Sequence, residues 1–492
     1  VSHAIQMHDR YYEEYHKQGW DKRRAIVAAF AELFVPTLSG IVTDAFGMLV
    51  IMLVPVAILQ RIAIWASIWV STVAISELIL NPIIYHYLRA PDRDKVLKRE
   101  KGLFQRALSS WSAVAVGPRA RWAIVAGWFV VFAIAASQWR HLTIGDPTAS
   151  TPLLSVDSPY NQAHIRIQDF FGGVEPLIVV AEGRDKEAMR RPETLEVMEA
   201  LQDHLQDDPA IGYSFSLTNI IKATNMLFHD GESRWGVIPP TKAVTSNLFF
   251  FYFLGTTPSE ASKFVDPSFT NSPVTFFCAN HQGDTVARIL GRAREFIDSH
   301  PSETVELRLA GGLIGVTAAA NEEILRNDIL MNFLGFATMW IIIVFQYRSF
   351  VAGFLMLVPL FLANGIGNAY MGFRNIGINL QSLPVVTVGV GFGIDYGVYI
   401  TSRAIEEIPV LGSVEAGVRR ALDSAGKAVT FTAGSFALST LTWAASNIRF
   451  NAEMGLMLFM WMIVSFLAAV SLLPAILVIF RPRFLFNRQL LG

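Results

Sequence analysis

Eight long apolar blocks constrain this chain more than any other feature of its sequence. A helix of about 20 apolar residues matches the thickness of the hydrocarbon core of a bilayer. We therefore expect each block to be a membrane-spanning helix, and residues 1–12 to be the end of another. The blocks are 34–58, 62–88, 122–138, 329–346, 350–371, 380–402, 427–446 and 453–480.

A polar segment at about 140–325 separates the third block from the fourth and has an ordinary soluble composition. Strand-like and helix-like patterns alternate along it, which predicts an α+β domain built from two ferredoxin-like βαβ halves. We expect strands at 176–181, 273–279 and 305–310, and helices at 192–205, 285–300 and 316–330.

Two further features of the polar segment have simple interpretations. The aromatic run Phe249–Phe253 is either a buried strand or the wall of a lipophilic pathway, and the strand is the safer interpretation. His141, His164 and His229 show no metal-type clustering with acids along the sequence, so we expect ordinary surface residues.

Basic residues predict the orientation of the helices, because cytoplasmic loops carry an excess of Lys and Arg. The linker after the second block and the end of the chain are both rich in these residues. They fall on one side if the spans alternate. We therefore expect a multi-pass protein of the bacterial inner membrane with its large soluble domain in the periplasm.

An internal repeat organises the spans. Residues 1–88 repeat 394–480, and the alignment places Ser2-His3 over Asp395-Tyr396. Parallel repeats of this kind are typical of transporters. A span and an outer domain precede the second copy only, so we expect the N-terminal part of the natural protein to be missing here.

Six regions follow from the blocks, the linker and the repeat. We expect 1–88 to end the first transmembrane repeat, 122–138 to be a separate span, and 329–480 to be the second repeat. The intervening regions are a basic cytoplasmic linker (89–121), a periplasmic porter-like domain (139–328) and a cytoplasmic tail (481–492).

A glycine-rich run lies inside the sixth block. Neither a strand–turn–helix context nor a following Lys supports a phosphate-binding loop, so the run predicts close packing between helices. Its glycines are Gly389, Gly391, Gly393 and Gly397.

Asp395 interrupts this run in the middle of a span. An ionised carboxylate facing lipid there would cost several kcal/mol, so we expect Asp395 to face the bundle interior. Because desolvation disfavours the charged form of a carboxyl group, such a residue can load and release a proton as its surroundings change. The alternative is a structural carboxylate that is hydrogen-bonded to a neighbour.

Other polar residues in the spans could complete a proton relay. Ser2-His3 is the position equivalent to Asp395-Tyr396, and His3 can pair with Asp395 if the two repeats face each other. Histidine suits a relay because its reference pKa lies near neutrality. Asp44 could join the network, or could be a partly hydrated acid in a polar crevice.

Three hydroxyl groups remain as candidate relay members. Tyr396 can donate a hydrogen bond to Asp395 or to a neighbouring span. Thr430 and Thr432 lie early in the next span and could hydrogen-bond the relay or hold a water. The alternative is a bond back to their own helix, as is common for hydroxyls in spans.

The remaining composition excludes several classes of function. The net charge of −1 gives no electrostatic case for a nucleic-acid partner. The single cysteine, Cys278, excludes an intrachain disulfide and a cysteine-based metal site. Since the soluble segment shows no nucleophile–base set or metal cluster, we expect no enzyme activity, no cofactor and no metal.

The chain resembles the resistance-nodulation-division (RND) superfamily of transporters over essentially its whole length. The resemblance rests on the glycine-rich span ending in Asp395-Tyr396, the turn at Phe345–Phe350 and the repeated helix set. The mycobacterial large membrane proteins and the hopanoid transporters are the most similar branch, because the outer domain is too short for a docking module.

The resemblance implies a proton-driven exporter of lipids or other hydrophobic molecules, with membrane lipids and periplasmic carrier proteins as partners. It implies that Asp395 and Tyr396 carry protons. Many lipid-exporting relatives have an Asp-Tyr pair in both halves, so Ser2-His3 here implies an asymmetric Asp–His arrangement.

A second class of function shares this membrane fold, namely a sterol-sensing receptor or a protein-translocation accessory. A continuous apolar tunnel in the outer domain would favour export, and a solid domain with an exposed groove would favour the alternative. The substrate and the oligomeric state stay open, since relatives act as monomers, dimers or trimers.

Overall fold

The computed structural model describes residues 2–94, 96, 102–147, 151, 153–379 and 382–487, without the side chains at positions 2, 384, 386–388, 390 and 392. The chain divides into two compact units. One unit comprises Val1–Thr143 and Glu323–Gly492, and the other comprises Ile144–Glu322.

The first unit is helical. Its elements are α1 (Ser2–Lys17), α2 (Lys22–Leu49), α3 (Ala57–Ile75), α4 (Asn81–Tyr87), α6 (Leu103–Ala115), α7 (Ala120–Ser137), α15 (Phe350–Arg374), α16 (Leu383–Leu411), α17 (Val414–Thr442) and α18 (Arg449–Phe480). Helix α14 (Gly312–Tyr347) leads the chain back into this unit from the other one.

Six helical segments in the described part of the chain are long and apolar enough to cross a membrane. They are Lys22–Leu53, Ala57–Tyr87, Ala120–His141, Gly312–Tyr347, Phe350–Arg374 and Arg449–Phe480. The two other predicted spans coincide with α16 and α17, which are each 29 residues long.

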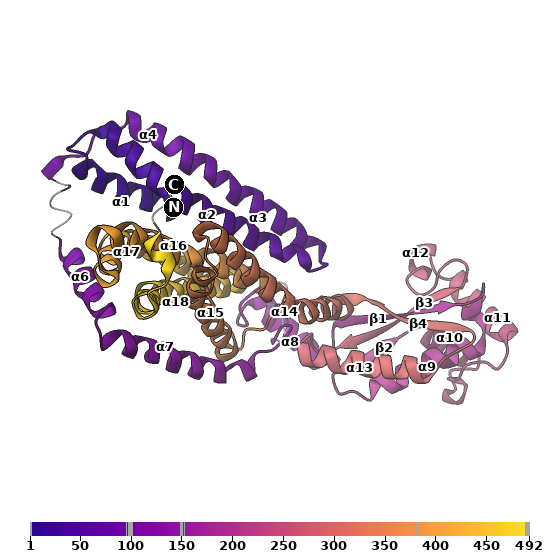
Figure 1. Ribbon diagram of the computed structural model, residues 1–492. Helices are drawn as coiled ribbons and strands as arrows, with labels where there is room; N and C mark the ends of the chain where they lie inside the picture. The colour runs from indigo at the N-terminus through magenta and orange to yellow at the C-terminus, as the bar shows by residue number, and fades with distance from the viewer. Residues whose placement is uncertain are drawn as a thin grey trace. The chain divides into compact units, whose positions relative to one another are not determined.

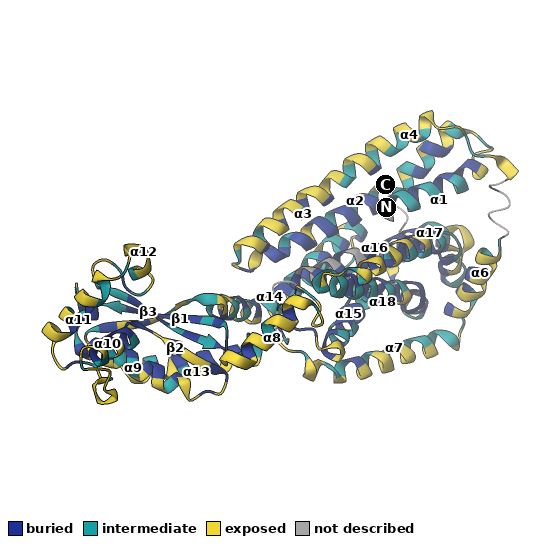
Figure 2. Ribbon diagram, turned by 180° about the vertical axis from the view of Figure 1, so that it is seen from behind, coloured by how far each residue is buried: buried dark blue, intermediate teal, exposed yellow. Residues whose placement is uncertain are grey.

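The outer faces of α3 and α7 are exposed, although their side chains are apolar (Figure 2). Trp69 is 73% exposed and Phe129 is 72% exposed. A soluble protein rarely exposes so continuous an apolar surface, whereas a lipid-facing helix requires one. The helical unit therefore belongs to a multi-pass membrane protein.

Local sequence signals set the ends of the central helices. Ser349 and Ser413 are the N-caps of α15 and α17, and each side chain accepts a hydrogen bond from the backbone N–H three residues later. Gly412 ends α16 with a φ of 68°, a left-handed conformation that glycine adopts without strain.

The second unit is built on a four-stranded sheet, with strands β1 (Glu175–Gly183), β2 (Ile211–Phe215), β3 (Asn271–Cys278) and β4 (Val305–Gly311). The strand order is β2-β3-β1-β4, and all neighbours are antiparallel. Helix α9 (Pro192–Gln206) connects β1 to β2, and α13 (Gly283–Ser299) connects β3 to β4. In each strand–helix–strand half, a strand of the other half lies between the two strands.

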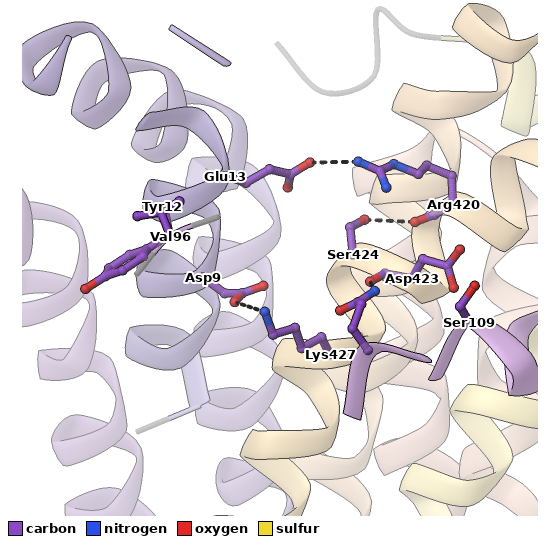
Figure 3. A pocket seen from close by; sticks show the side chains of 10 residues that line it. Asp9, Tyr12, Glu13, Val96, Ser109, Arg420, Asp423, Ser424 and Lys427 are labelled. Carbon is purple, nitrogen blue, oxygen red and sulfur yellow. Dashed lines mark hydrogen bonds and ion pairs between the residues drawn. The ribbon is translucent and has the colours of Figure 1, made fainter. Parts of the chain in front are cut away.

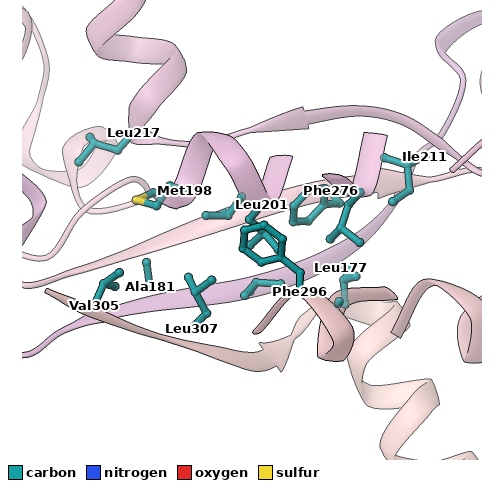
Figure 4. Close-up of a cluster of buried hydrophobic side chains, with 14 of the residues drawn as sticks. Leu177, Ala181, Met198, Leu201, Ile211, Leu217, Phe276, Phe296, Val305 and Leu307 are labelled. Carbon is teal, nitrogen blue, oxygen red and sulfur yellow. The ribbon is translucent and has the colours of Figure 1, made fainter. Parts of the chain in front are cut away.

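Alternation of buried residues along the strands produces the core of this unit. Leu177 and Phe276 are fully buried on the sheet, and Met198 and Phe296 meet them from α9 and α13 (Figure 4). Strand residues two apart share a face, and helix residues three or four apart share a stripe, so the two patterns cover each other.

The remaining elements of this unit are helices α8 (Pro159–Phe171), α10 (Leu217–Leu227), α11 (Lys242–Leu254) and α12 (Pro258–Ala261). The predicted strand at Phe249–Phe253 is wrong, because this run forms the end of α11. Phe249 packs in the core while Phe250 is exposed. A run of consecutive aromatic residues has no period, and so it does not distinguish a helix from a strand.

One of the three histidines differs from the expectation of an ordinary surface residue. His141 is exposed, as expected, although it belongs to the helical unit. His164 on α8 lies with its Nε2 3.4 Å from an oxygen of Glu175, a buried acid at the start of β1. His281, just after β3, lies closer still, with Nδ1 2.7 Å from the same carboxylate.

The His281–Glu175 pair should make the stability of the sheet depend on pH. Burial by itself lowers the pKa of His281, but the hydrogen bond and charge of Glu175 outweigh burial and raise that pKa above its ordinary value. The stabilisation is therefore complete below the ordinary pKa and is lost as the pH rises through the raised one. We expect amides of β1 and β3 to exchange hydrogen faster at pH 8.5 than at pH 5.5, after correction for intrinsic rates.

In the same experiment, His281→Gln should remove this difference, and the exposed control His300→Gln should keep it. Equal protection at both pH values in the unmodified chain would contradict the assignment.

Candidate functional site

Three polar side chains meet inside the helical unit. His3 comes from α1, Asp44 from α2 and Asp395 from α16, and each is at most 5% exposed. The Nε2 atom of His3 lies 3.8 Å from Oδ2 of Asp395, and one ligand atom from each of the three lies within 4.8 Å of the others. We call these three residues the intramembrane cluster.

The carboxylates of this cluster are only partly satisfied. Oδ1 of Asp44 and Oδ1 of Asp395 have no hydrogen-bond partner among the residues that the structure describes. A buried unpaired carboxylate is costly unless it binds a proton, a cation or water. The cluster is therefore suited to take up a small positively charged species.

The internal repeat explains how these residues meet. Setting Arg10 over Arg403 gives an offset of 393 residues (403 minus 10). With this offset, Lys22–Leu49 of α2 falls on 415–442, and α17 spans Val414–Thr442. The helices pack crosswise, since α1 contacts α17 and α16 contacts α2 (Figure 1). His3 and Asp395, near equivalent positions of the two repeats, thereby face each other.

A glycine permits the close approach of α2 and α16. A Cβ atom at Gly40 would lie 2.4 Å from Oδ1 of Asp395 and 3.0 Å from Cε1 of His3. Both distances are shorter than ordinary van der Waals contact, so any larger residue must displace the cluster.

The glycine-rich run of α16 packs mostly against α18. A Cβ atom would lie 2.7 Å from Trp461 at Gly389, 2.6 Å from the Ser465 hydroxyl at Gly393, and 3.2 Å from Leu473 at Gly397. At Gly391 the nearest atom is Oδ1 of Asp44, at 3.5 Å. These positions leave little room for a side chain.

The other residues predicted for the relay lie differently. The Tyr396 hydroxyl donates to the sulfur of Met462 on α18, at 3.7 Å. Thr430 bonds back to the Gly426 carbonyl at 2.7 Å, whereas the buried Thr432 hydroxyl has no partner in the described part of the chain. The side chain of Ser2 lies outside the described residues.

Sequence reasoning missed Tyr399, which lies one turn after Asp395. Its hydroxyl is 2.7 Å from Nδ1 of His3 and 3.2 Å from the hydroxyl of Thr37. All three side chains are buried. A tyrosine four residues after an intramembrane acid lies on the same helix face, and this spacing is the signal that could have found it.

Two further turns along the same helices, the repeats exchange ion pairs. Arg10 bonds Glu13 on its own helix at 2.8 Å and reaches Glu406 at 3.4 Å. Arg403 bonds Glu406 on its own helix at 2.7 Å and reaches Glu13 at 2.7 Å. We call these four residues the cross-repeat ring. The repeat offset places Arg10 over Arg403 and Glu13 over Glu406.

The two carboxyl groups of the ring respond differently to their surroundings. Burial by itself raises the pKa of Glu13, but Arg403, Arg10 and Lys17 outweigh burial and lower that pKa to about 2. The stabilisation that the Glu13 charge gives is complete above its ordinary pKa and is lost only as the pH falls towards about 2. For Glu406, burial outweighs the two arginines and raises the pKa.

The described part of the chain brings together one group of acid and histidine side chains that could share a small cation, and it is the intramembrane cluster. One histidine nitrogen and two carboxylate oxygens could hold a proton or a metal ion. The fold and site thus define a multi-pass membrane protein with a repeated helix set and a buried cluster of two acids and a histidine.

Comparisons with known proteins give the family. The model of the MMPL family matches residues 268–489. The chain is 20% identical over 340 residues to membrane protein MJ1562 of Methanocaldococcus jannaschii, covering 68% of this chain and 84% of that protein. It is 32% identical over 112 residues to the sulfolipid-1 exporter MmpL8 of Mycobacterium tuberculosis, covering 23% of this chain and 10% of the exporter.

Solved structures agree on the fold. The structure of SecDF, a translocon-associated membrane protein from Thermus thermophilus, matches 98% of this chain and 53% of its own chain. The TM-score is 0.53 and the identity 13%. The MMPL match over residues 268–489 and the MmpL relatives confirm the resemblance of this chain to MMPL-like proteins of the RND superfamily that the sequence indicated. It spans about half of SecDF and a tenth of MmpL8.

Gly40→Ala should disrupt the cluster without changing its chemistry. The new methyl group displaces Asp395 or His3, and overpacking of this kind costs about 1–3 kcal/mol. We expect a lower free energy of unfolding in detergent. Gly434→Ala is the matched control, because a Cβ atom at Gly434 on α17 meets nothing within 4 Å. Equal stability of the two variants would contradict the packing described here.

Arg403→Gln should break the cross-repeat ring. Removing one member of a buried ion pair costs about 3–5 kcal/mol, because the remaining charges lose their compensation. We expect Arg10→Gln to cost a similar amount, since it occupies the equivalent position. A double-mutant cycle of Arg403→Gln with Glu13→Gln should show coupling, and additive losses would show that the two residues act independently.

Proposed function

We propose that this chain is part of a proton-driven exporter that moves lipids or other hydrophobic molecules from the inner membrane towards the periplasm. The observation that carries the proposal is the intramembrane cluster. Each of its two buried acids has one oxygen without a hydrogen-bond partner among the described residues. His3 lies between Asp395 and the hydroxyl of Tyr399. Intramembrane acids that face one another mark ion pathways.

In the proposed mechanism, the cluster is accessible first from one side of the membrane and then from the other. A proton that binds Asp395 or Asp44 from one side neutralises the buried charge and stabilises one packing of the two repeats. Release to the other side restores the charge and the other packing. A proton crossing the full field gains about 2.3 kcal/mol per 100 mV, which is sufficient to bias such an equilibrium.

The crosswise packing of the repeats supports this mechanism. Because α1 contacts α17 and α16 contacts α2, a shift between α1 and α16 must move both repeats together. The proton-carrying roles of Ser2, Tyr396, Thr430 and Thr432 remain predictions from the sequence.

We also propose the placement of the regions. In this proposal the spans alternate in direction, so that the basic linker at 89–121 and the tail at 481–492 lie in the cytoplasm, and the α+β unit at 144–322 is a ferredoxin-like porter domain in the periplasm. The substrate class is proposed from the MMPL match and from the exporter MmpL8, whose name assigns it sulfolipid-1. Periplasmic carrier proteins are further proposed partners.

The sterol-sensing or translocation alternative shares the same fold. The likeness to SecDF supports only the fold at 13% identity, whereas the sequence relative MmpL8 is named as an exporter. A lipid bound to the α+β unit in the intact protein would favour export, and a bound unfolded polypeptide would favour the alternative.

Asp395→Asn should stop transport because asparagine does not carry a proton. The chain is placed in vesicles that contain an NBD-labelled phospholipid, and an imposed pH gradient drives transfer of the label to external albumin. We expect transfer to slow at least tenfold. Asp328→Asn on α14, an acid outside the cluster, should transfer label at the rate of the unmodified chain. Undiminished transfer by the Asp395 variant, at equal protein content, would exclude the proton relay.

A further inference from the structure

Two polar cavities lie along α1 on the side of the cluster where the cross-repeat ring is found. The larger has a volume of about 350 Å³ and lies between α1, α6 and α17 (Figure 3). Asp9 and Glu13 of α1 point into it towards Lys427 and Arg420 of α17. The opposed charges keep this cavity polar on both walls.

The smaller cavity has a volume of about 30 Å³ and continues from the larger one, with which it shares Asp9, Glu13 and Ser424. About 10–15 Å³ suffices for one water molecule, so the smaller cavity has room for one or two. The four residues of the cross-repeat ring also line it.

Gln6 and Tyr399 close the smaller cavity at its inner end. The repeat offset places Gln6 over Tyr399 (6 plus 393), so the cavity lies between equivalent side chains of the two repeats. Gln6 is 4% exposed, and its Nε2 has no hydrogen-bond partner among the described residues. A buried amide donor at the edge of a polar cavity of this size indicates a bound water.

Tyr399 joins this cavity to the intramembrane cluster. Its ring lines the smaller cavity, and its hydroxyl lies 2.7 Å from Nδ1 of His3. The opposite nitrogen of His3 lies 3.8 Å from Asp395. His3, Tyr399 and the smaller cavity therefore follow one another between Asp395 and the larger cavity, with a gap of 3.8 Å at the step from Asp395 to His3.

We infer that Tyr399, Gln6 and the two cavities form a half-channel through which the cluster exchanges protons with the aqueous phase at the arginine-rich end of the bundle. This inference rests on the proposed proton-driven function. It assigns the proton-transferring tyrosine to Tyr399, whose hydroxyl contacts His3, and the exit to a defined pair of cavities.

In the proposed proton transfer, Tyr399 gains one proton and releases another, so its net charge does not change. Asp395 gives a proton to Nε2 of His3 after a small approach, since 3.8 Å exceeds a hydrogen-bond distance. The imidazolium then gives its Nδ1 proton to the Tyr399 oxygen as that hydroxyl releases its own proton to water beside Gln6. Thr37, at 3.2 Å, accepts or donates a hydrogen bond that orients the hydroxyl.

The first experiment tests whether water reaches the cavities. Cys278, the single cysteine, is buried, so introduced cysteines report alone. Ser109→Cys and Ser424→Cys should react with a charged, membrane-impermeant methanethiosulfonate added at the arginine-rich side. Ala433→Cys, buried in an apolar cluster on the same helix as Ser424, should stay unreacted. A Ser424 variant as unreactive as the Ala433 variant would overturn the half-channel.

The second experiment measures proton flux into vesicles that contain the intact chain and a pH-sensitive dye. Tyr399→Phe and Gln6→Leu should each lower the flux at least tenfold, and Tyr370→Phe on α15, away from the cavities, should not. The methanethiosulfonate adduct of Ser424→Cys should block the flux relative to the same variant before reaction, so that the two measurements differ only in the adduct.

The outcomes separate the two proposals. Flux that persists in Asp395→Asn would overturn the proposed function itself. Flux that stops in Asp395→Asn but continues in Tyr399→Phe and in the blocked Ser424 variant would leave that function intact and overturn the half-channel. An unfolded Tyr399 variant leaves the blocked Ser424 variant to decide.

Discussion

The arrangement of this bundle depends on the ion pairs that Arg10 and Arg403 make with glutamates of the opposite repeat. Each arginine bonds a glutamate on its own helix and reaches the equivalent glutamate of the other repeat. Separating α1 from α16 would remove the ion pairs between the repeats and leave each arginine only the glutamates of its own repeat; losing a buried pair costs more than losing an exposed one. The ring thus fixes the register of α1 relative to α16. Two helical turns away, the same register places His3 next to Asp395.

The repeats share a framework but differ in chemistry where they meet. Ser2-His3 occupies the place of Asp395-Tyr396, so the bundle has one carboxylate where a symmetric relay would have two. Asp44 supplies the second acid from α2, while the equivalent position on α17 is Ala437 (44 plus 393). Gln6 and Tyr399 also occupy equivalent positions of the two repeats and have different polar side chains. The two halves therefore resemble each other in packing and differ in the polar side chains that they contribute where they meet.

Much of this architecture could be predicted from the sequence, because long apolar blocks and a repeat are strong signals. Strands β1, β3 and β4 were predicted from alternating apolar residues, whereas β2, with only five residues, was missed. The Phe249–Phe253 run was assigned wrongly because consecutive aromatics fit either periodicity. At the site, Asp395 was evident as an acid inside a span. The contact of Tyr399 with His3 was not evident, since it depends on how two distant helices cross.

Crosswise packing also affects how the protein must be made. Helices α1 and α2 contact α16 and α17, which a ribosome completes almost four hundred residues later. Until then, Asp44 and the charged face of α1 lack the partners that α16 and α17 supply, in a setting where unpaired polar groups are costly. Native contacts so distant along the chain are slow to form and leave intermediates open to misassembly. Biogenesis of this bundle therefore requires the early helices to be shielded by the insertion machinery or by one another until the last ones arrive.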